Sequence, residues 1–125
     1  MASFDETSLF TNVPVDYTIN IILDYIYVDK RIECKIKRDD FRKLLKKAIT
    51  SQFVFNDVIY EQIDGCPMGN ALSTYFANIF MCHLEETFMI NNSDFPLYYR
   101  RYVDDTFLIF EDRDSALKFF ATKLC

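Results

Sequence analysis

Two adjacent aspartates, Asp104 and Asp105, interrupt the apolar run RRYVDDTFLIF at residues 100–110. Two carboxylates about 4 Å apart repel by about 4 kcal/mol at an effective dielectric near 20, so solvent or a cation must offset them. A third carboxylate, Asp5, ends the short strand-like segment SFD. If this segment and the strand next to Asp104-Asp105 are neighbours in one sheet, Asp5 and Asp104 reach the same edge of that sheet. Together they then form a hard-oxygen site for Mg²⁺, which is suited to phosphoryl or nucleotidyl transfer. The alternative is that Asp104-Asp105 is simply a good hairpin turn.

A second segment, DGCPMGNALS at residues 64–73, contains both glycines of the chain, Gly65 and Gly69. Their scarcity elsewhere singles out this loop as a place where the backbone has special requirements. The alternative is an ordinary loop that opens a helix.

Several elements must position these residues. A strand at 3–5 is followed by a helix that begins near Pro14, and a second helix begins with Asp39 or Asp40 as its cap. Residues 52–63 predict a hairpin with its turn at Asn56-Asp57, since both residues tolerate turn geometry.

The loop at 64–73 leads into a long helix, which carries Glu85 and Glu86 near its exposed end. A second hairpin turns at Asp104-Asp105, and a last helix is capped by Asp114 or Ser115. The order strand, helix, helix, hairpin, helix, hairpin, helix predicts an α+β fold with helices on a mostly antiparallel sheet.

The composition fits one globular domain over residues 1–125, because half of the 125 residues are apolar and 13 Phe and 8 Tyr supply a core. The formal net charge of −5 gives the whole domain no electrostatic attraction for nucleic acid. Residues 30–47 nevertheless hold nine basic side chains against three acidic ones, either a solvated helix face or a phosphate-binding patch.

The four cysteines are scattered and form no C-x-x-C pair, which favours free thiols in a reducing compartment over structural zinc. The sequence has no apolar run long enough for a membrane span and no signal-peptide pattern, so we predict an intracellular chain without a membrane partner.

Three segments together resemble the palm motifs of reverse transcriptases: FDETSLFTNVP, GCPMGNALSTYFANIFM and YRRYVDDTFLIF, in the family's order and at about its separations. The set is most similar to the Penelope-like retroelement branch, which is related to telomerase catalytic subunits. The resemblance covers residues 3–124 and implies a polymerase palm, an RRM-like antiparallel sheet backed by helices, as a fragment that lacks fingers and thumb.

By this resemblance, Asp5 and Asp104 match the aspartates that hold two Mg²⁺ ions, for which Mn²⁺ can substitute, and Asp105 matches the accessory carboxylate of the catalytic set. Glu6 would contribute only its backbone carbonyl to a metal. Phe10 matches the bulky residue that stacks under the incoming sugar and disfavours a ribose 2′-OH; the alternative is a core aromatic.

The loop with Gly65, Pro67, Gly69 and Asn70 is similar to the family's nucleotide-binding loop, in which glycine lets the backbone approach the template and the nucleotide closely. The residues that would lie beside the primer and template are Tyr102, Val103 and Arg101. The chain departs from the family pattern at Glu6 and at Asn70-Ala71, and the segments that would form the fingers, the thumb and an endonuclease are not present.

The resemblance implies an RNA-directed DNA polymerase of a retrotransposon, with an RNA template, a DNA primer and dNTP as partners and a nuclear location. The alternative is a catalytically inactive, truncated relic that at most binds metal or nucleic acid. A third possibility, an RRM-type RNA-binding module, has less support because the sequence lacks an RNP-type aromatic segment. The template, the priming mode and the oligomeric state are not determined by the sequence.

Overall fold

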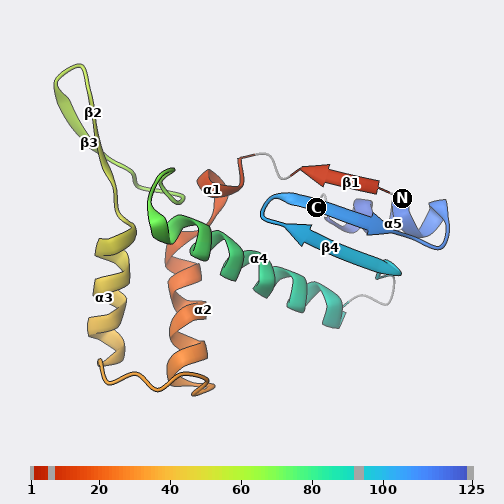
Figure 1. Ribbon diagram of the computed structural model, residues 1–125, viewed down its shortest axis with the longest axis horizontal. Helices are drawn as coiled ribbons and strands as arrows, with labels where there is room; N and C mark the ends of the chain where they lie inside the picture. The colour runs from red at the N-terminus through yellow and green to blue at the C-terminus, as the bar shows by residue number, and fades with distance from the viewer. Residues whose placement is uncertain (1, 6–7, 92–94, 124–125) are drawn as a thin grey trace. The chain divides into compact units, whose positions relative to one another are not determined.

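The structure is a computed structural model, which describes residues 2–5, 8–91 and 95–123 (Figure 1). Side chains are described over residues 8–90 and 95–121. The chain forms two compact units. We call residues 8–83 the helical unit and residues 1–7 with 84–125 the sheet unit.

The sheet unit is built on three antiparallel strands in the order β1-β5-β4. They are β1 (Ala2–Asp5), β4 (Tyr98–Tyr102) and β5 (Asp105–Ile109), accompanied by the C-terminal part of α4 (Ala71–Asn91) and by α5 (Arg113–Lys123). The central strand β5 alternates, with Thr106 and Leu108 buried and the residues between them exposed. Successive side chains of a strand point to opposite faces, so the sheet has one buried face and one open face.

An aromatic cluster forms the core beside the buried face. Phe119 of α5 is 3% exposed, and its ring centroid lies 5.1 Å from that of Phe88 in α4 and 5.3 Å from that of Phe110. The α5 helix begins at Arg113, and the Asp112 carboxylate accepts a hydrogen bond from the Ser115 N–H at 2.7 Å. That bond lowers the pKa of Asp112. The predicted cap at Asp114 or Ser115 was therefore wrong, because the acidic residue before the first helical turn has the free N–H groups within reach.

The helical unit contains three helices, a hairpin and the start of α4. Its elements are α1 (Leu9–Asn12), α2 (Val15–Tyr27), α3 (Arg38–Ile49), β2 (Gln52–Phe55), β3 (Val58–Glu61) and the N-terminal part of α4. Its core consists of the buried side chains of Leu9, Val13, Ile19, Leu23, Ile49, Cys66, Phe76, Ala77 and Met81. The helices α2 and α3 lie side by side (Figure 1) and are joined by exposed ion pairs, Arg38 to Asp24 at 2.6 Å and Lys46 to Asp16 at 2.7 Å.

The start of α3 differs from the prediction. The helix begins at Arg38 with Lys37 as the capping residue, so Asp39 and Asp40 lie within the first turn rather than at the cap. Acidic side chains in a first turn interact favourably with the helix dipole, which explains why they tolerate this position. Part of the basic stretch at 30–47 is also directed at α2, because Arg42 donates to the Asn20 side chain at 2.6 Å in addition to the two ion pairs.

The hairpin β2–β3 extends away from α2 and α3 (Figure 1). Its predicted turn at Asn56-Asp57 is confirmed, with φ of 50° and 59°. All eight residues of its two strands are exposed, including Phe53, Val54 and Ile59.

The observed architecture confirms the predicted α+β class, with antiparallel pairing in both described sheets. Among the described helices, none combines the length and the apolar character needed to cross a membrane.

Candidate functional site at the β4–β5 turn

The register of the sheet brings together the aspartates of the first and third motifs. β1 pairs with β5 so that Asp5 stands directly opposite Asp105, and Asp104 is the residue before Asp105. Opposite residues of an antiparallel pair have Cα atoms about 4.5–5.5 Å apart and share one face of the sheet. The prediction that the strand ending at Asp5 and the strand next to Asp104-Asp105 are neighbours in one sheet is thus confirmed for the backbone. Glu6 lies outside the described residues, and for Asp5 the description covers the backbone.

The turn itself lies one residue earlier than predicted. Val103 and Asp104 form the two-residue turn, and Asp105 is the first residue of β5, paired with both Tyr102 and Asp5. Asp105 is in the central strand of the sheet, and pairing on both sides holds it in the ladder. Of the two aspartates, only Asp104 has the freedom of a turn residue.

Val103 has a φ of 55°, in the left-handed region. A β-branched residue in that region is a genuine outlier, and such strain persists only where the surroundings impose it. The Val103 carbonyl accepts a hydrogen bond from Arg101 Nη1 at 3.0 Å. That carbonyl belongs to the peptide that joins Val103 to Asp104, so the bond restricts the orientation of the peptide that leads into the aspartate.

Arg101 also forms an ion pair on the buried face of the sheet. Its Nε and Nη2 donate to the two carboxylate oxygens of Glu85 in α4, Nη2 at 3.3 Å, and the side chains are only 7% and 19% exposed. Tyr99 donates its hydroxyl to the same Glu85 oxygen, Oε1, at 2.5 Å. Burial, followed by the adjacent Glu85 carboxylate, raises the pKa of Tyr99 well above its ordinary value, so the hydroxyl remains a donor at neutral pH.

The prediction that Glu85 lies near the exposed end of the long helix was wrong, since its side chain is only 19% exposed and is paired with the buried Arg101. A signal was present in the spacing: Glu85 follows the buried Met81 by four residues and precedes Phe88 by three, which puts it on the apolar stripe of α4. Next to this cluster, Thr106 pairs with Arg101 in the sheet and is 2% exposed.

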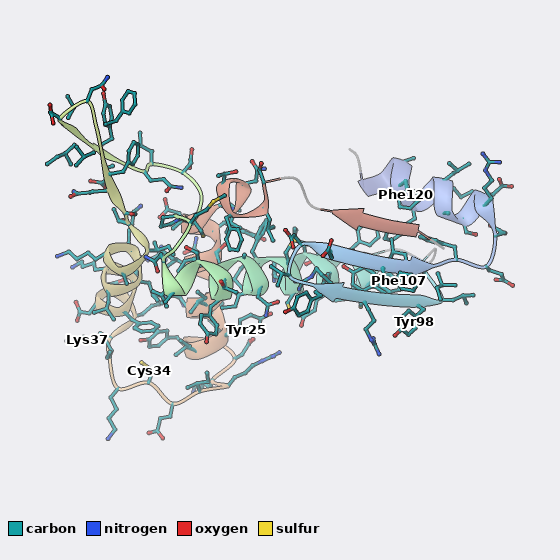
Figure 2. The ribbon with its side chains drawn as sticks, turned by 45° about the horizontal axis from the view of Figure 1, so that its top comes forward. Tyr25, Cys34, Lys37, Tyr98, Phe107 and Phe120 are labelled. Atoms are coloured by element: carbon teal, nitrogen blue, oxygen red, sulfur yellow. The ribbon has the colours of Figure 1, made fainter. Side chains whose placement is uncertain are left out.

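The open face of the sheet carries aromatic and basic side chains. Tyr102 is 80% exposed and stands opposite Asp105. The Arg100 guanidinium lies 5.0 Å from the centroid of the Tyr98 ring, which meets Phe107 of the neighbouring strand edge to face at 6.2 Å (Figure 2). Of the two arginines in YRRYVDD, Arg100 therefore belongs to the open face and Arg101 to the buried one.

In the helical unit, the structure brings Phe10 next to the glycine loop. The Cys66 N–H donates to the Phe10 carbonyl at 2.6 Å, and Phe10 packs partly buried against the core. Gly65 has a φ of 73°, and a Cβ there would lie 2.5 Å from the carbonyl oxygen of Thr11. Glycine is thus required at this point both by its backbone angle and by the close approach of α1. Burial raises the pKa of the Cys66 thiol to about 11.

The remaining residues of the predicted nucleotide loop have local partners. Asn70 caps α4, accepting from the Leu72 N–H at 2.9 Å and donating to the Ala48 carbonyl at 2.8 Å. The Pro67 carbonyl accepts a hydrogen bond from the Ser73 hydroxyl at 2.6 Å. Gly69 has a φ of 86° and open space where a Cβ would stand. The predicted contacts of these residues with a nucleotide stay predictions.

Within the described side chains, which exclude that of Asp5, no group of three or more His, Cys, Asp or Glu is arranged to hold a metal ion. The donors that the register brings to one end of the sheet are nevertheless carboxylates, the ligand type that Mg²⁺ prefers. Comparison with known proteins found no match to a family model, a curated protein or a solved structure.

Proposed function

We propose that this chain is the palm of a retroelement reverse transcriptase, an RNA-directed DNA polymerase, with its catalytic site at the β4–β5 turn. The observation that carries the proposal is the register that sets Asp5 opposite Asp105 with Asp104 adjacent. Like charges directly opposite in a sheet are destabilising, so this arrangement is explained best by a cation that the carboxylates share.

Asp5 and Asp104 are the residues proposed to hold two Mg²⁺ ions, with Asp105 as the accessory carboxylate. When bound, the ions neutralise phosphate charge and lower the pKa of the attacking hydroxyl. In the reaction, the 3′-oxygen of the primer bonds to the α-phosphorus of a dNTP, and the bond to the pyrophosphate leaving group breaks. The contribution of the protein is mainly positioning and electrostatic stabilisation.

The open face next to the aspartates supports a place for the primer terminus. Tyr102 is exposed beside Asp105 and offers a ring on which a base could stack. Val103 shares the turn with Asp104, and Arg100 gives this face a guanidinium for a phosphate. The loop at Gly65 and Gly69, with Phe10 beside Gly65–Cys66, is the proposed contact for the incoming nucleotide.

The metal site is tested by titrating the chain with Mn²⁺, followed by the paramagnetic signal of free Mn²⁺. We expect weak binding by the natural chain, and Asp104→Asn should abolish it. Asp57→Asn is a matched control, since Asp57 is also a turn aspartate and lies in the other hairpin. An affinity for Mn²⁺ that Asp104→Asn leaves unchanged would refute the proposed site.

Catalysis is tested by template-directed primer extension with the same variants. Incorporation of dNTP that Asp104→Asn eliminates and Asp57→Asn preserves supports the polymerase. Mn²⁺ binding at Asp104 without incorporation supports the alternative, a palm that binds metal without catalysis. In an extending polymerase, Phe10→Ala should relax the discrimination against ribonucleotides, and unaltered selectivity would return Phe10 to a purely structural role.

A further inference from the structure

The guanidinium of Arg101 connects a helix to the turn that carries Asp104. On one side it meets both carboxylate oxygens of Glu85 in α4, and on the other its Nη1 donates to the Val103 carbonyl at 3.0 Å. Both side chains of the pair are largely buried. The orientation of the guanidinium is therefore set by the helix, and the hydrogen bond from Nη1 to the Val103 carbonyl transmits that orientation to the turn.

The hydrogen bond from Arg101 acts on the Val103–Asp104 peptide, whose carbonyl belongs to a residue with a strained backbone. Val103 is held at a φ of 55°, a conformation that its own side chain disfavours. The Nη1 bond fixes the plane of the peptide that follows, and this plane determines where the Cα of Asp104 stands. Without the bond, the strained turn would be free to relax and would carry the aspartate with it.

The other contacts of Glu85 support the same arrangement. Tyr99 donates to Glu85 Oε1 from the strand that leads into the turn, so the carboxylate is held by groups two residues apart on one strand. A bidentate carboxylate with a further hydroxyl donor has little rotational freedom.

We infer that Glu85 is a positioning residue for the candidate site: through Arg101 it holds the Val103–Asp104 peptide in the conformation that presents Asp104. The inference rests on the proposed function only in the consequence for metal binding. Its structural part concerns the turn alone and can be measured without metal.

The test uses Glu85→Gln, which retains the shape of the side chain and removes its charge. The control is Glu86→Gln, which makes the same change at the next, exposed position of α4. Two quantities are measured in the full chain: the amide chemical shifts and the Val103 three-bond H–N–Cα–H coupling without metal, and the dissociation constant for Mn²⁺.

We expect Glu85→Gln to change the Val103 coupling and the Asp104 and Asp105 amide shifts, and to raise the Mn²⁺ dissociation constant by about 10-fold, as for loss of an outer-shell partner. Glu86→Gln should leave all of these near the natural values. An unchanged coupling and unchanged shifts in a folded Glu85→Gln chain would overturn the inference. If the natural chain binds no Mn²⁺ while the coupling responds, the metal site fails and the positioning role stands.

Tyr99→Phe provides a second, milder variant in case Glu85→Gln does not fold. It removes a single donor to Glu85 and leaves the ion pair in place. We expect shift changes in the same direction and a weakening of Mn²⁺ binding by no more than about fivefold, the equivalent of one hydrogen bond. Amide shifts at Asp104 identical to those of the natural chain would contradict the proposed connection.

Discussion

The two hairpins, β2–β3 and β4–β5, are both antiparallel pairs with two-residue turns, but different residue types occupy the strained positions. In β2–β3 the left-handed backbone is taken by Asn56 and Asp57, whose short polar side chains tolerate it. In β4–β5 it is taken by Val103, for which it is unfavourable. The first turn is stable by local chemistry, whereas the second requires a partner elsewhere in the fold.

The strands differ in the same way. All strand residues of β2–β3 are exposed, while β4–β5 alternates and has Arg101, Thr106 and Leu108 on its buried side. Strain in a protein tends to collect at functional sites and is held there by the surrounding structure. The hairpin with the unfavourable turn residue is therefore the one that is held to a helix by a buried ion pair, and it is also the hairpin that carries Asp104 and Asp105.

The largest effect is expected from Arg101→Ala. Removing one partner of a buried ion pair leaves the other charge uncompensated, and we expect a loss of about 3–5 kcal/mol in the unfolding free energy. Arg100→Ala, on the open face of the same strand, should cost no more than about 1 kcal/mol, the value of an exposed cation–π contact. Urea unfolding followed by circular dichroism measures both, and equal losses would contradict the distinction between the two faces.

Two glycines in the loop after β3, Gly65 and Gly69, both have a positive φ, but only Gly65 has backbone atoms close to where a Cβ would lie. Substituting each of them by alanine therefore separates the free-energy cost of the backbone angle from that of the close contact. Gly65→Ala should destabilise by about 2–5 kcal/mol, because a left-handed alanine is strained and its Cβ would collide with the Thr11 carbonyl. Gly69→Ala meets open space and should cost only about 1–2 kcal/mol. Thermal unfolding of the two variants gives the difference, and a milder effect at Gly65 would show that α1 does not approach the loop so closely.

Exchanging the turn residues tests the difference between the hairpins most directly. Asn56→Val should destabilise by about 1–2 kcal/mol, since it introduces the strain that Val103 bears. Val103→Asn should cost less than about 0.5 kcal/mol, although it removes a half-buried valine, because relief of the strain compensates. The denaturant midpoints of the two variants, each compared with that of the natural chain, measure these costs. If the two exchanges have equal costs, the turn of β4–β5 is no more strained than that of β2–β3.

The last prediction concerns the hydroxyl of Tyr99, which donates to Glu85. Tyr99→Phe should cost about 1 kcal/mol by removing the hydrogen bond to Glu85. Because the folded state raises the pKa of Tyr99 above the ordinary 10.0, its protonated form contributes stability below pH 10.0, and this contribution is lost as the pH rises further. The stability of the natural chain should therefore fall more steeply above pH 10.0 than that of Tyr99→Phe. If the unfolding free energies of the natural chain and of Tyr99→Phe changed with pH in the same way, the Tyr99 hydroxyl would not be buried against the Glu85 carboxylate.

Local patterns in the sequence determined much of the fold. The strand at 3–5, the turn at Asn56-Asp57, the long helix after the glycine loop and the two hairpins were predicted from periodicity and turn chemistry. Element boundaries were less accurate. The cap of α3 and the turn of the second hairpin were each misplaced, because neighbouring aspartates suit a cap, a first turn and a hairpin turn almost equally well.

The tertiary structure decided which residues meet. That Asp5 faces Asp105 is a matter of register between strands about a hundred positions apart, and register depends on which side chains the sheet buries as a whole. The alternation of β4 places Arg100 and Arg101 on opposite faces but does not determine which of them is buried. Glu85 on α4 determines it, because it offers Arg101 a carboxylate on the largely buried face of the sheet. The sequence by itself supplied the carboxylates and the turn, and packing between a strand and a helix determined how the turn is held.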